Sequence, residues 1–317
     1  MSLPHYTDLD HGITAIDTGF CRHALAAAYL LIEKGRAAFI ETGTSLSIPG
    51  LLAVLDAKGI ARTAVDYVIP THVHLDHGGG AGELIRHLPE ARLIIHPRGA
   101  RHMIDPSQLI AGASAVYGEE AMARLYGTVV PVPEARVMQA HDGDIFSFNG
   151  RELRIIDTPG HARHHFCIVD AQGNGVYTGD TFGISYREFD VAGEVFLFPT
   201  TTPVQFEPEK LHASVDKIDA QGLDYIYLTH YGRIRKTPAL TQGLHEQIDA
   251  YVALGLALKD APNRHQALCE GMMDIMLSRL DALGCTLPKA EQRNLLEMDV
   301  TLNVQGLEIW LDREQAA

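Results

Sequence analysis

The sequence predicts an α+β fold in which mixed sheets are covered by helices and followed by an all-helical C-terminal region. Up to about residue 236, short β-branched or aromatic runs alternate with amphipathic helical stretches, and from about Thr237 only helical patterns remain. The turn signals Asn149-Gly150 and Gly173-Asn174-Gly175 lie between neighbouring strand-like runs and indicate hairpins. Hairpins beside strand–helix units favour mixed sheets over a purely parallel, doubly wound sheet.

The predicted strands are short runs rich in β-branched and aromatic residues: Ile13–Ile16, Ala28–Ile32, Ala37–Ile40, Tyr67–Ile69, Arg92–Ile95, Leu153–Ile156, Phe166–Val169, Gly175–Thr178 and Tyr225–Leu228. The predicted helices carry apolar residues at steps of three and four: Ile48–Lys58, Gly80–His87, Ala111–Tyr126 and Pro208–Ala220. Two further apolar stripes, Leu244 to Leu256 and Leu268 to Leu283, predict C-terminal helices. Gly284 is a helix stop, and Pro288 opens a third helix. We therefore predict two domains, 1–236 and 237–317.

The amino-acid composition disfavours several classes of function for this protein. The 26 basic and 40 acidic residues give a formal net charge of −14, and such a surface repels phosphate backbones, which disfavours nucleic acid as a partner. The sequence shows neither an apolar run of the roughly 20 residues that cross a bilayer nor a basic-headed apolar leader. The four cysteines have no metal-ligand or disulfide spacing. These features predict a cytoplasmic protein with no membrane partner and reduced thiols.

A histidine-rich motif directly follows the predicted strand Tyr67–Ile69 and precedes three glycines; its ligand-type residues are His72, His74, Asp76 and His77. Imidazoles with a carboxylate suit a hydrolytic site for zinc, iron or a similar ion. In an extended segment, His72 and His74 lie on the same side and can bind one ion together. Asp76 and His77 then turn toward a second position.

Three more ligand-type residues each follow a predicted strand. His161 comes after the turn Thr158-Pro159-Gly160, Asp180 comes after Gly179, and His230 comes after Thr229. Loops at strand ends are where a sheet presents reactive groups, and glycine allows the backbone to approach an ion closely. Four strand ends that each deliver metal-type side chains predict one convergent metal site.

Four motifs follow one another along the chain: His-x-His-x-Asp-His, Thr-Pro-Gly-His, Thr-Gly-Asp and Thr-His. Together they resemble the metallo-β-lactamase superfamily, in its glyoxalase-II-like (hydroxyacylglutathione hydrolase-like) branch, over about Gly12 to Gly232. The resemblance implies a four-layer αββα sandwich with a C-terminal helical extension and two divalent ions at one edge between the sheets. Zinc is favoured, with iron or manganese as alternatives. The implied ligands are His72, His74 and His161 for the first ion, Asp76, His77 and His230 for the second, and Asp180 as the bridge.

Two positions refine the resemblance. Asp180 stands where the commonest subclass of zinc β-lactamases has a cysteine, which disfavours antibiotic hydrolysis. The early strand reads Glu41-Thr42-Gly43 where the family usually has Asp-Thr-Gly. This departure bears on the hydrogen bonds that support the metal ligands.

The expected activity is hydrolysis of a small thioester, ester or lactone by a metal-bridging hydroxide, with Asp76 as the catalytic group that orients the water and moves its proton. Tyr186, Arg187 and Tyr231 are candidate substrate contacts because they lie close to Asp180 or His230 in the sequence. Two alternatives remain open: a mononuclear iron persulfide dioxygenase and a non-catalytic ligand-binding effector. The C-terminal helices are expected to cover the metal edge, and a role in a homodimer is the alternative.

Overall fold

The computed structural model describes residues 3–201 and 204–316, which form two compact units. The first unit holds the chain up to Asp157 together with His164–Gly179 and Leu223–Arg233. The second unit holds Thr158–Arg163, Asp180–Gly222 and the chain from Ile234 onward. Each unit is therefore assembled from three segments of the sequence. The domain boundary at residue 236 stays a prediction.

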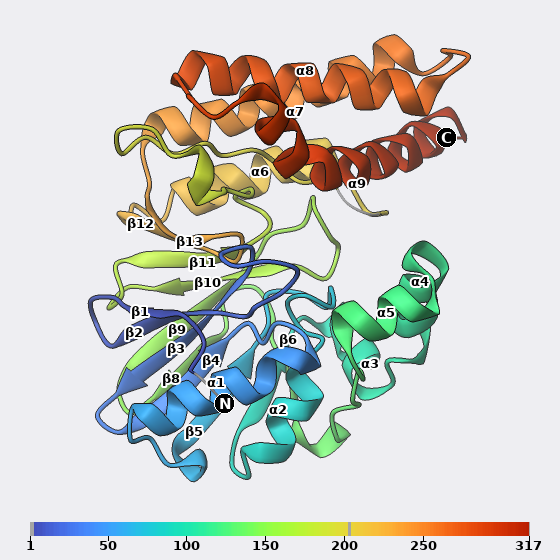
Figure 1. Ribbon diagram of the computed structural model, residues 1–317. Helices are drawn as coiled ribbons and strands as arrows, with labels where there is room; N and C mark the ends of the chain where they lie inside the picture. The colour runs from blue at the N-terminus through green and yellow to red at the C-terminus, as the bar shows by residue number, and fades with distance from the viewer. Residues whose placement is uncertain (1–2, 202–203, 317) are drawn as a thin grey trace. The chain divides into compact units, whose positions relative to one another are not determined.

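The first sheet has seven strands in sequence order: β1 (Tyr6–Asp8), β2 (Ile13–Asp17), β3 (Ala27–Glu33), β4 (Arg36–Ile40), β5 (Val65–Ile69), β6 (Arg92–Ile95) and β7 (Val137–Gln139). Strands β1 to β6 are labelled in Figure 1. Strands β1 to β4 pair antiparallel, and β4 to β7 pair parallel. Parallel neighbours need crossover connections. The helices in these connections are α1 (Ile48–Ala57), α2 (Ala81–His87), α3 (Pro97–Ile104), α4 (Ser107–Tyr117) and α5 (Glu119–Tyr126).

The second sheet has six strands in the order β13 (Gly232–Arg235), β12 (Tyr225–Leu228), β11 (Gly175–Gly179), β10 (Phe166–Asp170), β9 (Arg151–Asp157) and β8 (Ile145–Phe148). Strands β8 to β11 pair antiparallel through both predicted hairpins, and β11 pairs parallel with β12. The predicted mixed character of the sheets is confirmed.

Strand β3 shows how the first unit is packed. Ala28 and Leu30 join a core with residues of α1, α2 and α3, whereas Ala27, Tyr29 and Leu31 join a core with the second sheet. Successive side chains of a strand point to opposite faces. Because both faces of β3 are buried, its sequence is a continuous apolar run without polar alternation. The two sheets thus pack face to face, with helices on the outer face of the first.

The second unit contains the helices α6 (Pro208–Asp219), α7 (Pro238–Leu258), α8 (Arg264–Leu283) and α9 (Lys289–Ala316). The hydroxyl of Thr237 caps α7 by accepting a hydrogen bond from the Leu240 amide, and Gly284 ends α8 in the left-handed conformation. The predicted helical C-terminal region is confirmed. Among the residues that the structure describes, no helix combines the length and the apolar character needed to cross a lipid bilayer.

One predicted helix is divided in the structure. The stretch Ala111–Tyr126 was expected to be continuous, but α4 ends at Tyr117 and α5 begins at Glu119. Gly118 lies between them with a φ of +82°, a conformation that residues with a Cβ rarely adopt. The apolar period continues across the break, so the pattern alone did not reveal it.

A buried ion pair joins β9 to β10 in the first unit. The Arg151 guanidinium donates to both carboxylate oxygens of Asp170 and to the His11 carbonyl, 2.7 Å from Nη1, and both charged side chains are fully buried. Removing one partner of such a pair leaves an uncompensated buried charge. We expect Asp170→Ala to lower the free energy of unfolding by about 3–5 kcal/mol, measured by urea denaturation.

The matched control for this prediction is Asp312→Ala, which breaks the exposed pair between Asp312 and Arg264, 2.7 Å apart. Exposed pairs contribute about 0–1 kcal/mol, so the control should stay close to wild type. If Asp170→Ala lost no more stability than this control, the buried pair would not have the role assigned to it.

Candidate metal centre

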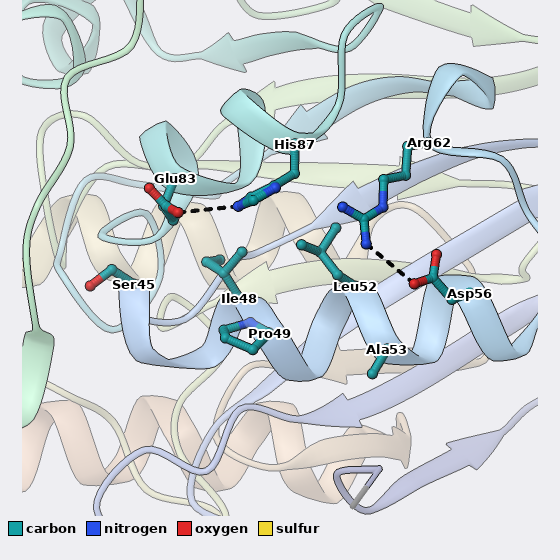
Figure 2. Close-up of a pocket in the computed structure, with 9 residues that line it drawn as sticks. All are labelled: Ser45, Ile48, Pro49, Leu52, Ala53, Asp56, Arg62, Glu83 and His87. Carbon is teal, nitrogen blue, oxygen red and sulfur yellow. Dashed lines mark hydrogen bonds and ion pairs between the residues drawn. The ribbon is translucent and has the colours of Figure 1, made fainter. Parts of the chain in front are cut away.

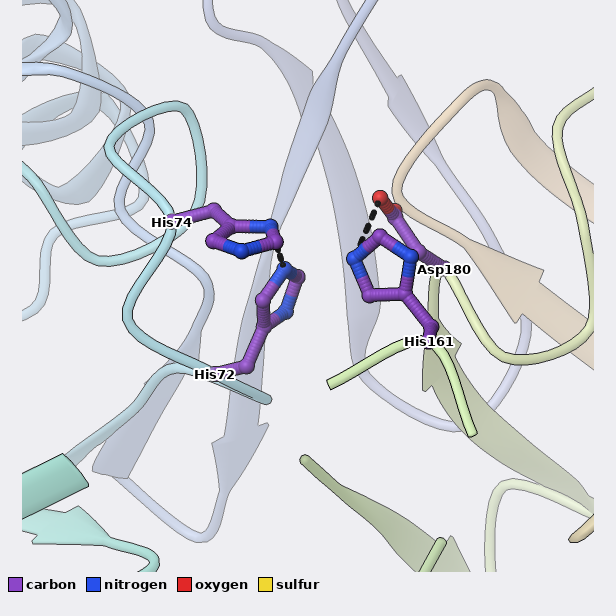
Figure 3. A group of neighbouring side chains, drawn as sticks. All are labelled: His72, His74, His161 and Asp180. Atoms are coloured by element: carbon purple, nitrogen blue, oxygen red, sulfur yellow. Dashed lines mark hydrogen bonds and ion pairs between the residues drawn. The ribbon is translucent and has the colours of Figure 1, made fainter. Parts of the chain in front are cut away.

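The first group of ligand-type side chains consists of His72, His74, His161 and Asp180 (Figure 3). Each offers one ligand atom, and these atoms all lie within 4.8 Å of one another. His72 Nε2 lies 2.8 Å from His74 Nδ1, and His161 Nε2 lies 3.5 Å from Asp180 Oδ2. His72 and His161 are fully buried. Nitrogen and carboxylate oxygen atoms so close together match the ligands that zinc and similar ions take from proteins.

The second group consists of Asp76, His77 and His230, whose ligand atoms also lie within 4.8 Å of one another. Asp76 Oδ2 lies 3.3 Å from His230 Nε2 and 3.7 Å from His77 Nε2. All three residues belong to the first unit, in the loops after β5 and β12. The structure therefore brings the ends of separate strands together, as the sequence predicted.

The hydrogen bonds behind the second group show that it fits a cation. His230 Nδ1 donates to the Leu25 carbonyl at 2.8 Å, and His77 Nδ1 donates to Glu41 Oε1 at 3.0 Å. The two Nε2 atoms, 3.4 Å apart, therefore both carry a lone pair when the rings are neutral. Two lone pairs and the Asp76 carboxylate, all within 4.8 Å of one another, form a donor set suited to a divalent ion.

Glu41 is a buried residue whose carboxylate supports side chains of both groups through hydrogen bonds. Its carboxylate accepts hydrogen bonds from the Thr71 amide at 3.1 Å, the Thr71 hydroxyl at 2.6 Å, the Thr229 hydroxyl at 3.0 Å and His77 Nδ1. The Thr71 hydroxyl in turn lies 3.1 Å from His72 Nδ1. Thus Glu41, at the family position usually held by aspartate, orients the segments that carry His72, His77 and His230. We infer no ligand role for Glu41 itself.

Glu41→Gln is expected to lower metal affinity about 10–100-fold, because the amide replaces one acceptor oxygen with a donor and no longer fixes the His77 ring. Competition with a chromophoric chelator measures the affinity. Glu152→Gln, on the exposed face of β9, is the control. Equal affinity in Glu41→Gln and wild type would contradict the positioning role.

The histidine motif has a different backbone from the one that we expected. Residues 71 and 72 form a bend and residues 75–80 form turns, with the amides of His77 and Gly78 donating to the His74 carbonyl at 3.0 and 2.8 Å. The segment is therefore not a strand. The rings of His72 and His74 nevertheless lie together, as expected, with their centroids 4.3 Å apart.

The glycine that precedes Asp180 is required for steric reasons. Gly179 precedes Asp180 with a φ of +48°, and a Cβ at this position would lie 2.4 Å from Thr71 Oγ1 and 2.5 Å from His165 Nε2. Such distances are far below van der Waals contact, so only glycine lets β11 end this close to the histidine motif. The close approach here is to the side chains of Thr71 and His165, and the predicted approach of the backbone to an ion stays a prediction.

The three candidate substrate contacts have different surroundings. Tyr186 is 1% exposed and donates to Asp299 Oδ2 at 2.7 Å within the second unit. Arg187 pairs with Asp190 at 3.2 Å, and Tyr231 is partly buried against the core between the sheets. Their contact with substrate stays a prediction. Sequence reasoning did not single out Asp299, although an acid within the apolar stripe of the last helix is a signal for a buried polar partner.

A cavity of about 340 Å³ lies elsewhere in the first unit, between α1 and α2 (Figure 2). Ile48 and Leu52 are among its apolar lining residues. Its charged lining residues pair with one another, Asp56 with Arg62 and Glu83 with His87, each at 3.2 Å. None of its lining residues belongs to the two metal-type groups. We assign it no part in the chemistry.

The model of the metallo-β-lactamase superfamily matches residues 24–230. The chain therefore belongs to this superfamily, as its motifs predicted. The glyoxalase-II-like branch stays a prediction.

Two curated relatives show the range of similarity. A metallo-β-lactamase fold-containing protein of Sulfurisphaera tokodaii is 26% identical over 184 residues, which make up 57% of this chain and 63% of that protein. An atrochrysone carboxyl ACP thioesterase of Aspergillus fumigatus is 30% identical over 131 residues, or 41% of this chain and 31% of that protein. The match thus spans less than two thirds of either relative's length.

Solved structures share the fold. An archaeal metallo-β-lactamase superfamily protein from Sulfolobus tokodaii superposes with a TM-score of 0.66 at 21% identity, covering 94% of this chain and 99% of that one. A metallo-β-lactamase family protein from Thermus thermophilus also has a TM-score of 0.66, at 20% identity, with 96% and 94% covered. The predicted sandwich with a C-terminal helical region is confirmed.

Proposed function

We propose that this protein is a binuclear metal-dependent hydrolase of a small thioester, ester or lactone. The observation that carries the proposal is the gathering of seven ligand-type side chains from four strand ends into two groups. Membership of the superfamily supports metal-dependent hydrolysis. The thioesterase named among the relatives supports an acyl substrate.

In this proposal, His72, His74 and His161 hold one ion, Asp76, His77 and His230 hold the other, and Asp180 is shared. Imidazole and carboxylate ligands favour zinc, with iron or manganese as alternatives. When bound, two such ions lower the pKa of a shared water toward about 7 and polarise the carbonyl that this water attacks. The protein's own part is to hold its ligands in fixed tautomers, which Glu41 and the Leu25 carbonyl do for the second group.

Asp76 is the residue proposed to move the proton. Its side chain is 21% exposed, so it is the most accessible member of the second group, whose histidines are buried. A carboxylate at this point can accept a proton from the attacking water and deliver it to the leaving group. This assignment requires no serine or cysteine nucleophile.

The proposal is tested by metal analysis of purified protein together with a hydrolysis screen over thioesters, lactones, aryl esters and phosphodiesters. We expect about two ions per chain and turnover of an acyl substrate. Removing the ions with a chelator should abolish turnover, and zinc should restore it.

Two outcomes would replace the proposal. One ferrous ion per chain with thiol-dependent oxygen uptake would identify a persulfide dioxygenase. Two ions per chain without turnover of any substrate class would favour a ligand-binding effector.

A further inference from the structure

Two histidines on neighbouring helices of the second unit meet outside the metal-type groups. His212 on α6 and His245 on α7 place their Nδ1 atoms 2.6 Å apart. Their ring centroids are 4.9 Å apart and the ring planes differ by 7°. The two centroids are farther apart than the two Nδ1 atoms by about twice the distance from a ring centre to its nitrogen, so both centroids and both Nδ1 atoms lie nearly on one line. Because the ring planes are also nearly parallel, the rings lie edge to edge in nearly one plane. Their Nδ1 atoms therefore point at each other.

Each ring is held from behind by an aspartate of the other helix. His212 Nε2 lies 3.1 Å from Asp249 Oδ1 on α7, and His245 Nε2 lies 3.1 Å from Asp216 Oδ1 on α6. An ionised carboxylate only accepts hydrogen bonds, so each Nε2 carries the hydrogen and each Nδ1 of a neutral ring carries the lone pair. A carboxylate behind an imidazole is the arrangement that orients metal-binding histidines and raises their basicity.

The helices are fixed to each other next to this pair. The carboxylate of Asp219, at the end of α6, accepts hydrogen bonds from Lys236 at 2.6 Å and from Thr241 at 3.2 Å. Thr241 lies one turn before His245 on α7. The backbone positions of the pair are therefore set before any ligand arrives, which lowers the ordering cost of binding.

We propose that His212 and His245 form a second, separate binding site for a transition-metal ion such as zinc, with Nδ1 of each ring as the ligand and Asp249 and Asp216 as positioning residues. Bonds of about 2.0–2.1 Å to one tetrahedral ion need the nitrogens roughly 3.3 Å apart, so the Nδ1–Nδ1 distance opens by about 0.7 Å. Each ring also turns by roughly 35°, so that the two lone pairs converge on the ion and no longer point at each other. The side chains are 26% and 19% exposed, which leaves room for that movement and for water as the remaining ligands. Imidazole ligands select such an ion over magnesium or calcium.

The test is a zinc titration, by calorimetry, of the full chain already loaded at its metal centre. Wild type should bind about one zinc ion per chain beyond that loading, and magnesium should give no such binding. The double variant His212→Gln/His245→Gln should lose the additional ion. Asp249→Asn should weaken its binding about 10–100-fold, because the His212 ring loses its carboxylate. His87→Gln is the matched control, since His87 is also a helix-surface histidine paired with an acid, Glu83, at 3.2 Å.

Equal additional zinc binding by wild type and the double variant would overturn the proposal, as would no additional binding by wild type at any concentration. In the second case the two rings share a proton only. If the double variant does not fold, as judged by circular dichroism, the single variant His245→Gln gives the same comparison. Because the readout is zinc binding and not hydrolysis, failure here leaves the proposed hydrolase function untouched.

Discussion

Asp180→Ala is expected to lose metal from both groups and to reduce hydrolysis at least about a thousandfold. Asp180 is buried and lies 3.5 Å from His161 Nε2, and it is proposed as the carboxylate shared by the two ions. Its loss removes one anionic ligand from each ion, and a metal pair contributes several kcal/mol of transition-state stabilisation, with about 1.36 kcal/mol for each tenfold in rate. Metal content and kcat/KM are measured on the same preparation.

The control for this variant is Asp224→Ala, which removes an exposed carboxylate before β12. It should keep both ions and its activity. Retention of two tightly bound ions by Asp180→Ala would show that the bridging residue has been misassigned, whereas loss of one ion alone would place Asp180 in a single coordination sphere.

Asp76→Asn is expected to lower kcat about 100- to 10,000-fold, because the amide cannot accept the proton that the carboxylate moves. The substitution keeps the shape of the side chain and an oxygen near His230 Nε2. Substrate affinity should therefore change much less than kcat, and this split distinguishes a catalytic residue from a binding one. Stopped assays across a range of substrate concentrations, with metal content determined in parallel, provide the measurement.

Asp56→Asn serves as its control, since Asp56 is an exposed acid on α1 that pairs with Arg62. It should leave kcat unchanged. An Asp76→Asn variant that holds two ions and has the wild-type kcat would exclude proton transfer by Asp76. A variant that loses the second ion as well would show that ligation is its larger role.

The long, strongly patterned elements could be predicted from the sequence. Strands such as β3 and β10 are buried on both faces, and burial on both faces requires the apolar, β-branched runs that were recognised. The short strands at the sheet margins, β1, β7, β8 and β13, were not predicted. Each has only three or four residues and includes a polar side chain or a glycine, so its own sequence gives a weak signal and its strand conformation depends on pairing with a neighbouring strand.

The ligand-type residues could also be identified from the sequence, because histidine and aspartate that follow four separate strands are rarely explained by anything other than a metal site. The sequence pointed to Glu41 as a residue that bears on the hydrogen bonds of the ligands, but it did not predict the partners of Glu41. The Glu41 network joins residues 41, 71, 77 and 229, and the partners of Tyr186 and Arg151 lie 113 and 19 residues away. Such bonds leave no spacing in the sequence, because a buried polar group takes whichever partner the packed backbone brings within reach.

Local chemistry thus determined the strand and helix types, the hairpin turns and the set of metal-type side chains, since each depends on residues adjacent in the chain. Only the tertiary structure decided which atoms of those side chains face one another. The lone pairs at His77 and His230 are directed by Glu41 and Leu25, and the rings of His212 and His245 are held by aspartates on the opposite helix. The tautomer and the orientation of each histidine ring are set by its hydrogen-bond partner. These partners are distant in the sequence and become neighbours only when the backbone has folded.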